Sequence, residues 1–124
     1  MIIAVDFDGT IVENAFPAIG NAIPEAVETL KFMVNRGHRI ILHTCRTNRL
    51  TSGRRPLDEA AQWCKAHGIE LYAVNDNPVS RAQYGAQSKV YADMYIDDHG
   101  FGIPMVNGHV DWMTIKAYFK RLKR

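Results

Sequence analysis

Two pairs of acidic residues stand directly after short apolar segments of this sequence. Asp6 and Asp8 follow the opening run IIAV, and Asp97 and Asp98 follow the run MYI. Carboxylates that lie close together at the edge of a protein core repel one another and resist the loss of water. Either a cation compensates them, or each pair belongs to an ordinary solvated turn, because Asp-Gly is a common turn sequence.

Closely spaced carboxylates could support two connected kinds of chemistry. Oxygen ligands together with water suit Mg²⁺, which proteins usually hold with a few carboxylates and a substrate phosphate. One carboxylate can also attack phosphorus and form an acyl phosphate, while a second protonates the leaving alkoxide and later deprotonates water. A hydroxyl and an ammonium group would then balance the charge on the phosphoryl oxygens, and Thr44 and Lys89 are candidates for these roles.

The predicted secondary structure would bring these residues together. Short apolar runs predict strands at residues 2–5, 39–43, 69–74 and 94–96, and helical spacing of apolar residues predicts helices that begin at Pro24, at Pro56 and after Asp111. The alternation predicts an α/β fold, a three-layer Rossmann-like domain with a mainly parallel central sheet. In such a sheet the carboxyl ends of the strands share one edge, where ligands bind. We therefore expect the acidic pairs and Thr44 to meet at that edge.

The composition predicts a single domain over residues 1–124. Hydrophobic residues make up 47% of the chain and charged residues 23%, and the net charge of +2 is too small to argue for nucleic-acid binding by itself. No apolar run approaches the ~20 residues of a membrane span, and no basic segment precedes the first apolar run as in a signal peptide. Two widely spaced cysteines, Cys45 and Cys64, are expected to be free thiols, which favours a cytoplasmic location.

The order of these residues resembles that of the haloacid dehalogenase superfamily of phosphohydrolases. DFDGT is similar to the first motif of that family, in which an apolar strand ends in D-x-D-G-T. ILHT is similar to the second motif, Lys89 can fill the third, and MYIDD is similar to the acidic fourth. The resemblance extends from residue 2 to about residue 98, and the first motif is its most specific part.

The resemblance implies a Mg²⁺-dependent phosphatase that hydrolyses a phosphomonoester through an aspartyl-phosphate. Asp6 would be the nucleophile and Asp8 the general acid and base, and the presence of this second aspartate favours ester hydrolysis over the other reactions of the superfamily. The implied metal ligands are Asp6, Asp8, Asp97 and Asp98. The implied phosphate-binding residues are Gly9, Thr44, Cys45, Arg46 and Lys89.

Two features distinguish this chain from typical members of that family. Only the segment VYAD separates Lys89 from the following strand, so Lys89 is expected on a loop, and Arg46 or Arg81 could share its task. No segment is long enough to form an inserted cap domain, so the chain resembles the capless type. Capless relatives accept large substrates or close their sites with a neighbouring subunit, which leaves small molecules, polynucleotide ends and a homo-oligomer open.

A basic loop after Thr44 is a further candidate for substrate contact. Its arginines suit phosphate or carboxylate recognition, and they are Arg46, Arg49, Arg54 and Arg55. An exposed loop is often basic without any ligand, so this interpretation and the solvated one stay equally open.

Two rival functions remain open at this stage. A phospho-accepting signalling domain of the response-receiver type has a similar size and similar parts, although there Thr and Lys follow all the acidic residues, and here Thr44 and Lys89 precede the second pair. A catalytically weak member that binds phosphorylated ligands is the other alternative.

Overall fold

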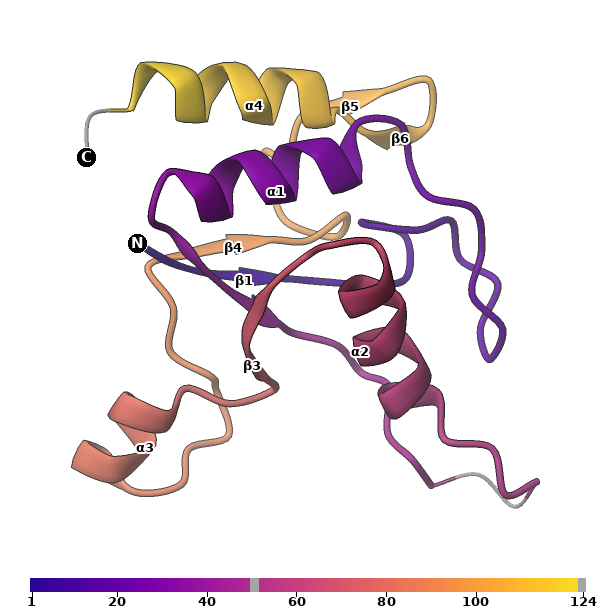
Figure 1. The fold of residues 1–124 in the computed structure, drawn as a ribbon, viewed down its shortest axis with the longest axis vertical. Helices are drawn as coiled ribbons and strands as arrows, with labels where there is room; N and C mark the ends of the chain where they lie inside the picture. Colours follow the sequence, from indigo (N-terminus) through magenta and orange to yellow (C-terminus); the bar gives the residue numbers. More distant parts are fainter. Residues whose placement is uncertain (50–51, 123–124) are drawn as a thin grey trace.

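Four parallel strands form the central sheet of the molecule (Figure 1). A computed structural model describes residues 1–49 and 52–122. The sheet has the order β3-β2-β1-β4, and its strands are β1 (Ile2–Val5), β2 (Arg39–Leu42), β3 (Leu71–Val74) and β4 (Met94–Ile96). The register places Ile3 of β1 beside Ile40 on one side and beside Met94 on the other. The sequence prediction of an α/β fold with a parallel sheet is confirmed.

Four helices and a small hairpin surround this sheet. The helices are α1 (Ala26–Asn35), α2 (Pro56–Ala66), α3 (Pro78–Tyr84) and α4 (Trp112–Arg121), and an antiparallel hairpin joins β5 (Met105–Val106) to β6 (His109–Val110). Helices α1 and α4 lie side by side on one side of the sheet, and α3 lies on the opposite side (Figure 1). None of the helices in the described ranges combines the length and apolar character needed to cross a membrane.

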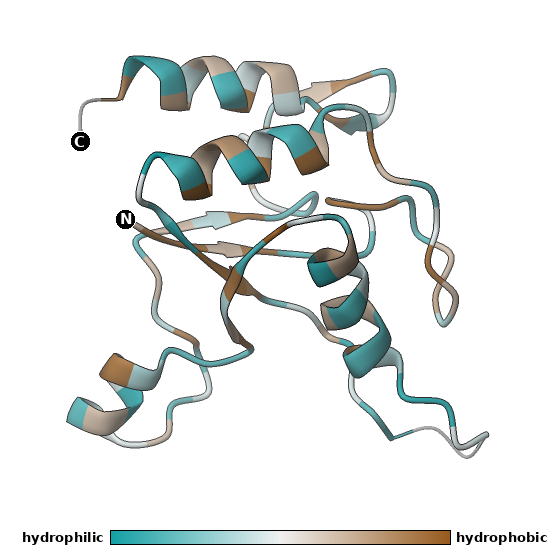
Figure 2. Cartoon of the chain, in the orientation of Figure 1, coloured by the Kyte–Doolittle hydropathy of each residue, from teal (hydrophilic) through white to brown (hydrophobic). Residues whose placement is uncertain are grey.

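The two faces of the sheet are covered very differently. On one face, Val5 and Leu42 of the strands belong to a large core that also contains Leu30 of α1, Cys64 of α2 and Phe119 of α4. The other face is covered mainly by the segment after α3, and this second cluster centres on Ala4, Ile41 and Ala92. Figure 2 shows β1 and β2 as largely hydrophobic, whereas the helices alternate between hydrophobic and hydrophilic residues. The fold therefore has three layers. Helices cover one face of the sheet, and a thinner layer formed by α3 and the segment after it covers the other (Figure 1).

The structure corrects three boundaries and one omission of the sequence prediction. Strand β2 ends at Leu42 and not at His43. The first helix begins at Ala26 and not at Pro24, because Glu25 has a φ of 68° and closes a turn. Strand β3 begins at Leu71, two residues later than expected. Helix α3 was not predicted, although Asn77 caps it by accepting a hydrogen bond from the Ser80 N–H and Pro78 begins it. The predicted cap of the last helix is confirmed, since the Asp111 side chain accepts from the Thr114 N–H.

Candidate active site at the carboxyl ends of the strands

The carboxyl ends of the strands bring the acidic residues to one edge of the sheet. The Asp6 N–H donates to the Ile96 carbonyl at 2.9 Å, and the His43 N–H donates to the Val5 carbonyl at 2.8 Å, so the ladder continues to the rim. A pocket of about 490 Å³ opens there. Its lining residues are Asp6, Asp8, Asn14, Phe16, Thr44, Cys45, Arg46, Asp97, Asp98 and His99. The expectation that both acidic pairs and Thr44 converge is therefore confirmed.

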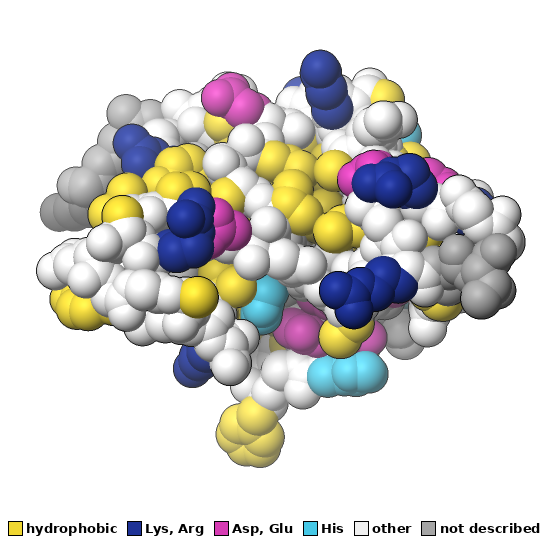
Figure 3. All heavy atoms as spheres, turned by 90° about the horizontal axis from the view of Figure 1, so that it is seen from below, with side chains coloured by type: hydrophobic (Ala, Val, Ile, Leu, Met, Phe, Trp, Pro, Cys, Tyr) yellow, Lys and Arg dark blue, Asp and Glu magenta, His cyan; other side chains and the backbone are white. Residues whose placement is uncertain are grey.

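Seen from below the sheet, acidic and histidine side chains gather in one part of the surface (Figure 3). The carboxylate oxygens of Asp97 and Asp98 and a ring nitrogen of His99 all lie within 4.8 Å of one another. The backbone holds this group, because the His99 N–H donates to Asp97 Oδ1 at 2.9 Å. These donors come from a single turn after β4.

Thr10 connects the first acidic pair to the second. This residue is fully buried, and its hydroxyl accepts a hydrogen bond of 2.9 Å from the Asp98 N–H. The same Oγ1 lies 3.1 Å from Asp6 Oδ2 and 3.3 Å from Asp98 Oδ1. A hydroxyl has one proton, so it donates to one of these two carboxylates at a time. Thr10 thereby fixes the turn after β1 against the turn after β4.

Gly9 allows this close approach. Its φ is +87°, and a β-carbon built on it would overlap Asp98 Oδ2. Only glycine adopts this backbone conformation readily and also leaves room for the carboxylate. Gly9, which the resemblance implies as a phosphate-binding residue, lies directly against the Asp98 carboxylate.

The Asp6 carboxyl has a pKa raised from 3.8 to about 7. Burial is the largest cause, the negative charge of Asp97 is the next, and a side-chain hydrogen bond with Asp98 adds to both. The Thr10 hydroxyl acts in the opposite direction by donating to the carboxylate. A group of carboxylates whose charges disfavour one another in this way fits a bound divalent cation, which would favour their ionised forms. The oxygen-rich donor set suits Mg²⁺.

Asp8 faces a different partner. The Arg46 side chain forms a bidentate ion pair with it, in which Nε lies 2.8 Å from Oδ2 and Nη2 lies 2.8 Å from Oδ1. Arg46 is almost completely buried, with 2% of its surface exposed. Such a parallel fork fixes the plane of the carboxylate as well as its charge.

The remaining donors of Arg46 hold the surrounding loops. Its Nη1 donates to the Pro17 carbonyl at 3.1 Å and to the Pro56 carbonyl at 3.2 Å, and its Nη2 also donates to the Ala18 carbonyl at 2.8 Å. All five N–H groups of a guanidinium are then used. The sequence prediction of Arg46 as a phosphate-binding residue is therefore corrected, because its charge and donors are committed to Asp8 and to backbone carbonyls.

Thr44 and Cys45 lie where the second motif predicted. The Thr44 N–H donates to Asn75 Oδ1 at 2.8 Å, and the Thr44 hydroxyl accepts from the Arg46 N–H at 3.1 Å. The hydroxyl proton of Thr44 remains available to a ligand in the pocket. Cys45 is an exposed free thiol beside it.

Lys89 does not line this pocket. It lies in the loop between α3 and β4, as expected, but its Nζ sits 5.2 Å from the ring centroid of Tyr95. Arg81, the other proposed substitute, pairs with Asp76 at 3.0 Å. Arg54 and Arg55 of the basic loop pair with Glu59 and Asp58. Of the four arginines of that loop, all of them in the described ranges, only Arg46 lines the pocket.

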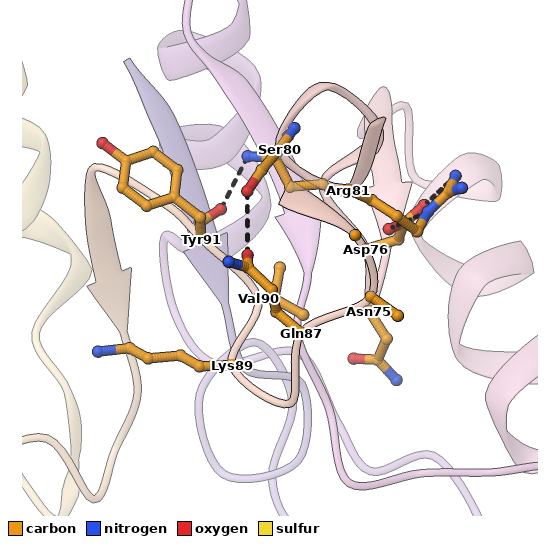
Figure 4. A pocket seen from close by; sticks show the side chains of 11 residues that line it. Asn75, Asp76, Ser80, Arg81, Gln87, Lys89, Val90 and Tyr91 are labelled. Atoms are coloured by element: carbon orange, nitrogen blue, oxygen red, sulfur yellow. Dashed lines mark hydrogen bonds and ion pairs between the residues drawn. The ribbon is translucent and has the colours of Figure 1, made fainter. Parts of the chain in front are cut away.

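A second, smaller pocket of about 240 Å³ lies under α3 (Figure 4). Its polar groups bind one another: the Asn77 amide donates to the Tyr91 carbonyl at 2.9 Å, and the Ser80 hydroxyl donates to Gln87 Oε1 at 3.1 Å. Lys89 extends from its rim (Figure 4). These pairings explain how the loop after α3 is held against the sheet.

The predicted site residues did not include four residues of the site, which are Thr10, Asn14, Phe16 and His99. The sequence places Thr10 in a tight turn, and its position in D-x-D-G-T is the signal that could have drawn attention to its hydroxyl. Phe16 lies in a loop with no pattern, so only the fold could place it in the pocket wall. His99 directly follows the second acidic pair in the sequence, where both a plain loop residue and a contact to substrate are conceivable, and its ring nitrogen lies 3.7 Å from Asp98 Oδ2.

The comparisons with known proteins give one relative. No family model matches the sequence, and no curated protein matches it. A solved structure of a conserved protein coded by a locus of Bacteroides thetaiotaomicron is similar to this chain, with 44% sequence identity and a TM-score of 0.79. The similarity covers 100% of this chain and 93% of that one. The chain therefore belongs to the same family as this conserved Bacteroides protein.

Proposed function

We propose that this protein is a Mg²⁺-dependent phosphatase of the haloacid dehalogenase type that hydrolyses a phosphomonoester. One observation carries the proposal. Asp6, with a pKa raised to about 7 by burial and by Asp97, lies at the sheet edge beside the second acidic pair. Asp8, two residues further, lines the same pocket.

In the first step of the proposed reaction, an oxygen of the Asp6 carboxylate attacks phosphorus. A bond forms between that oxygen and phosphorus while the bond to the leaving oxygen breaks. For this step Asp8 would have to carry a proton on the side of the carboxyl that faces the pocket, and it gives this proton to the leaving alkoxide. In the second step, water attacks the phosphorus of the aspartyl-phosphate and gives a proton to Asp8. Inorganic phosphate leaves, and both aspartates return to their starting states.

Arg46 would serve this reaction as a positioning residue for Asp8. Each Asp8 oxygen accepts one hydrogen bond from the guanidinium, and each keeps a further lone pair that can face the pocket. The fork fixes the direction of those lone pairs, so the proton is delivered from a defined place.

The carboxylates of Asp6, Asp97 and Asp98 would hold the Mg²⁺ ion, together with the backbone carbonyl of Asp8. A bound Mg²⁺ ion supplies positive charge that balances the phosphoryl oxygens. His99 is a poorer partner for this hard cation, because Mg²⁺ prefers oxygen ligands. Its imidazole is better suited to contact substrate.

Thr44 and Lys89 would bind the phosphoryl oxygens. The Thr44 hydroxyl already accepts from the Arg46 N–H, so its own proton can be donated to phosphate. Lys89 would have to rotate away from Tyr95, and this contact at an exposed ring is weak, worth about 0.5–1 kcal/mol. A charge-assisted hydrogen bond to phosphate would replace it.

The proposed location of the protein is the cytoplasm. Free thiols at Cys45 and Cys64 are consistent with a cytoplasmic location. The substrate would enter a pocket that opens directly to solvent. A neighbouring subunit of a homo-oligomer could close this pocket.

The test is phosphate release from a chromogenic phosphomonoester, with and without Mg²⁺. We expect Mg²⁺-dependent turnover in the natural protein and none in Asp6→Asn. In Asp8→Asn, we expect a phosphorylated protein to accumulate, because a good leaving group departs unaided while hydrolysis of the intermediate lacks its base. Turnover in Asp6→Asn would remove the assigned nucleophile. A long-lived phosphorylated form of the natural protein after treatment with acetyl phosphate would favour a response-receiver-type domain.

A further inference from the structure

Phe16 forms an aromatic wall of the carboxylate pocket. Its side chain lines the same pocket as Asp6, and the residue is 50% exposed. It lies in the loop at residues 13–22, whose ends are joined by a 2.8 Å hydrogen bond from the Glu13 N–H to the Asn21 carbonyl. A large apolar ring half exposed in a pocket beside carboxylates is a candidate contact for substrate.

The ring of Phe16 is held in place from its buried side. The Arg46 guanidinium carbon lies 5.2 Å from the ring centroid. The same guanidinium binds the carbonyls of Pro17 and Ala18, directly after Phe16 in the chain, and pairs with Asp8. The position of the ring is therefore tied to the position of the proposed acid and base. The exposed side of the Phe16 ring is a flat surface, and its position relative to Asp8 is fixed by Arg46.

The charges of the pocket restrict what the leaving group can be. Apart from the carboxylates, most of the lining side chains carry no charge, and these are Asn14, Phe16, Thr44 and Cys45. The charge of Arg46 is balanced by its ion pair with Asp8. Of the residues that line the pocket within the described ranges, only His99 could offer a further positive charge. A leaving group with additional phosphates would lie next to carboxylates without a cation to balance it. A neutral, planar group would find a ring to stack on.

The polar group nearest to this ring suits a nucleobase. The Asn14 side-chain oxygen accepts from the Phe16 N–H at 3.3 Å, which leaves the NH₂ of the amide for an acceptor on a ligand. His99 adds a second planar side chain to the lining, from the opposite segment after β4. A pocket of about 490 Å³ has room for a base and a sugar beyond the phosphate.

We propose that the substrate is a nucleoside monophosphate whose base stacks on the exposed face of Phe16 while its phosphate lies at Asp6. This inference rests on the proposed phosphatase activity and adds the class of substrate to it. The base gains contact with a ring that is already fixed, so little ordering of the protein opposes binding. Stacking contacts tolerate different bases, so we expect a preference for nucleotides in general rather than for one base.

The experiment compares kcat/KM for a nucleoside monophosphate with kcat/KM for glycerol phosphate. Phe16→Leu keeps an apolar side chain but removes the flat ring, and we expect the ratio of the two values to fall about tenfold. The loss should fall on KM for the nucleotide, because stacking contributes equally in the ground state and in the transition state. Phe16→Trp should keep or raise the ratio. Phe101→Leu, at a fully exposed phenylalanine that does not line the pocket, should leave it unchanged.

The possible outcomes distinguish a failure of the proposed nucleotide specificity from a failure of the proposed phosphatase activity. If no ester releases phosphate, including the chromogenic one, the proposed function fails. If esters are hydrolysed but the natural protein shows no preference for the nucleotide, or Phe16→Leu and Phe101→Leu shift the ratio equally, only the inference about substrate is overturned. A 3′- or 5′-phosphorylated oligonucleotide that is hydrolysed better than the mononucleotide would also overturn it, in favour of a polynucleotide end. Melting temperatures of all variants show whether each one is folded.

Discussion

The buried guanidinium of Arg46 donates a hydrogen bond to each carboxylate oxygen of Asp8, from Nε to Oδ2 and from Nη2 to Oδ1, and both distances are 2.8 Å. The two residues are 38 positions apart in the sequence. The same guanidinium also binds the loop at Pro17 and the start of α2 at Pro56. One side chain thus fixes three segments around Asp8, so the ion pair stabilises the fold and also orients the proposed acid and base.

Replacing Arg46 should destabilise the fold and slow the reaction. Arg46→Met leaves Asp8 as a poorly solvated, unpaired carboxylate, and we expect the free energy of unfolding to fall by about 3 kcal/mol or more. Arg46→Lys keeps the charge but cannot reproduce the fork, so we expect an intermediate loss of stability and a lower kcat. Urea denaturation and steady-state kinetics measure the two effects. Arg55→Lys at an exposed ion pair is the matched control, and equal stability of both lysine variants would contradict this role of Arg46.

Gly9→Ala should be more harmful than the same change at another glycine of similar conformation. Gly9 and Gly102 have φ of +87° and +82°, but a β-carbon at Gly102 meets nothing within 4 Å, whereas at Gly9 it overlaps Asp98. We expect Gly102→Ala to cost about 1 kcal/mol from backbone strain alone. Gly9→Ala should cost more and should also weaken Mg²⁺ binding, because Asp98 must move. Calorimetric titration with Mg²⁺ checks this, and equal affinity in the two variants would contradict it.

The Thr10 hydroxyl should matter more than the Thr10 methyl. Thr10→Val leaves the Asp98 N–H without its acceptor, and we expect a loss of about 1–3 kcal/mol in unfolding free energy. Because the Thr10 hydrogen bond lowers the pKa of Asp6, Thr10→Val should also raise that pKa further. Thr10→Ser retains the hydroxyl and should lose much less. Thermal melts of both variants, with an NMR titration of the Asp6 carboxyl, measure these effects; a Ser variant as unstable as the Val variant would show that packing dominates.

The raised pKa of Asp6 predicts an unusual pH dependence for the metal-free protein. The folded pKa of about 7 lies above the ordinary aspartate value of 3.8, so between these values the folded state binds more protons than the unfolded state. The contribution of Asp6 to stability is therefore greatest below pH 4, decreases as pH rises towards 7, and is constant above that. Mg²⁺ should reverse the trend, because it favours the ionised carboxylate and releases a proton on binding.

Asp6→Asn tests this pH dependence directly. In EDTA at pH 8 we expect the variant to melt at a higher temperature than the natural protein, because the disfavoured charge is gone. At pH 5 the two melting temperatures should be closer. Adding Mg²⁺ should raise the melting temperature of the natural protein more than that of the variant. A natural protein that is more stable than Asp6→Asn in EDTA at pH 8 would show that the charge of Asp6 is already compensated.

Several features of this structure could be predicted from the sequence because short-range patterns determine them. The four central strands are apolar runs bounded by polar residues, and parallel pairing then brings Asp6, Thr44 and Asp97 to one edge. What could not be predicted depends on contacts between distant segments. The pairing of Arg46 with Asp8 requires the fold to bury a charge that looks like part of a solvated basic loop. Phe16 reaches the pocket because the carbonyls after it bind the same arginine.

Lys89 provides the last test, because its role requires movement. Its Nζ lies over Tyr95, whose ring is 5.9 Å from that of His43, the residue before Thr44. If the ammonium group exchanges this ring for a bound phosphate, Lys89→Met should raise KM for a phosphomonoester about tenfold or more, the value of one charge-assisted hydrogen bond.

Arg39 offers a matched control for that variant. Its guanidinium carbon lies 5.0 Å from the ring centroid of Tyr72, so it makes the same kind of contact, but it stands at the amino end of β2, away from the pocket. Arg39→Met should leave KM unchanged. If both variants behave alike, Lys89 only covers the sheet, and the phosphoryl group must then be neutralised by the metal ion and by hydrogen bonds from Thr44 and the nearby backbone.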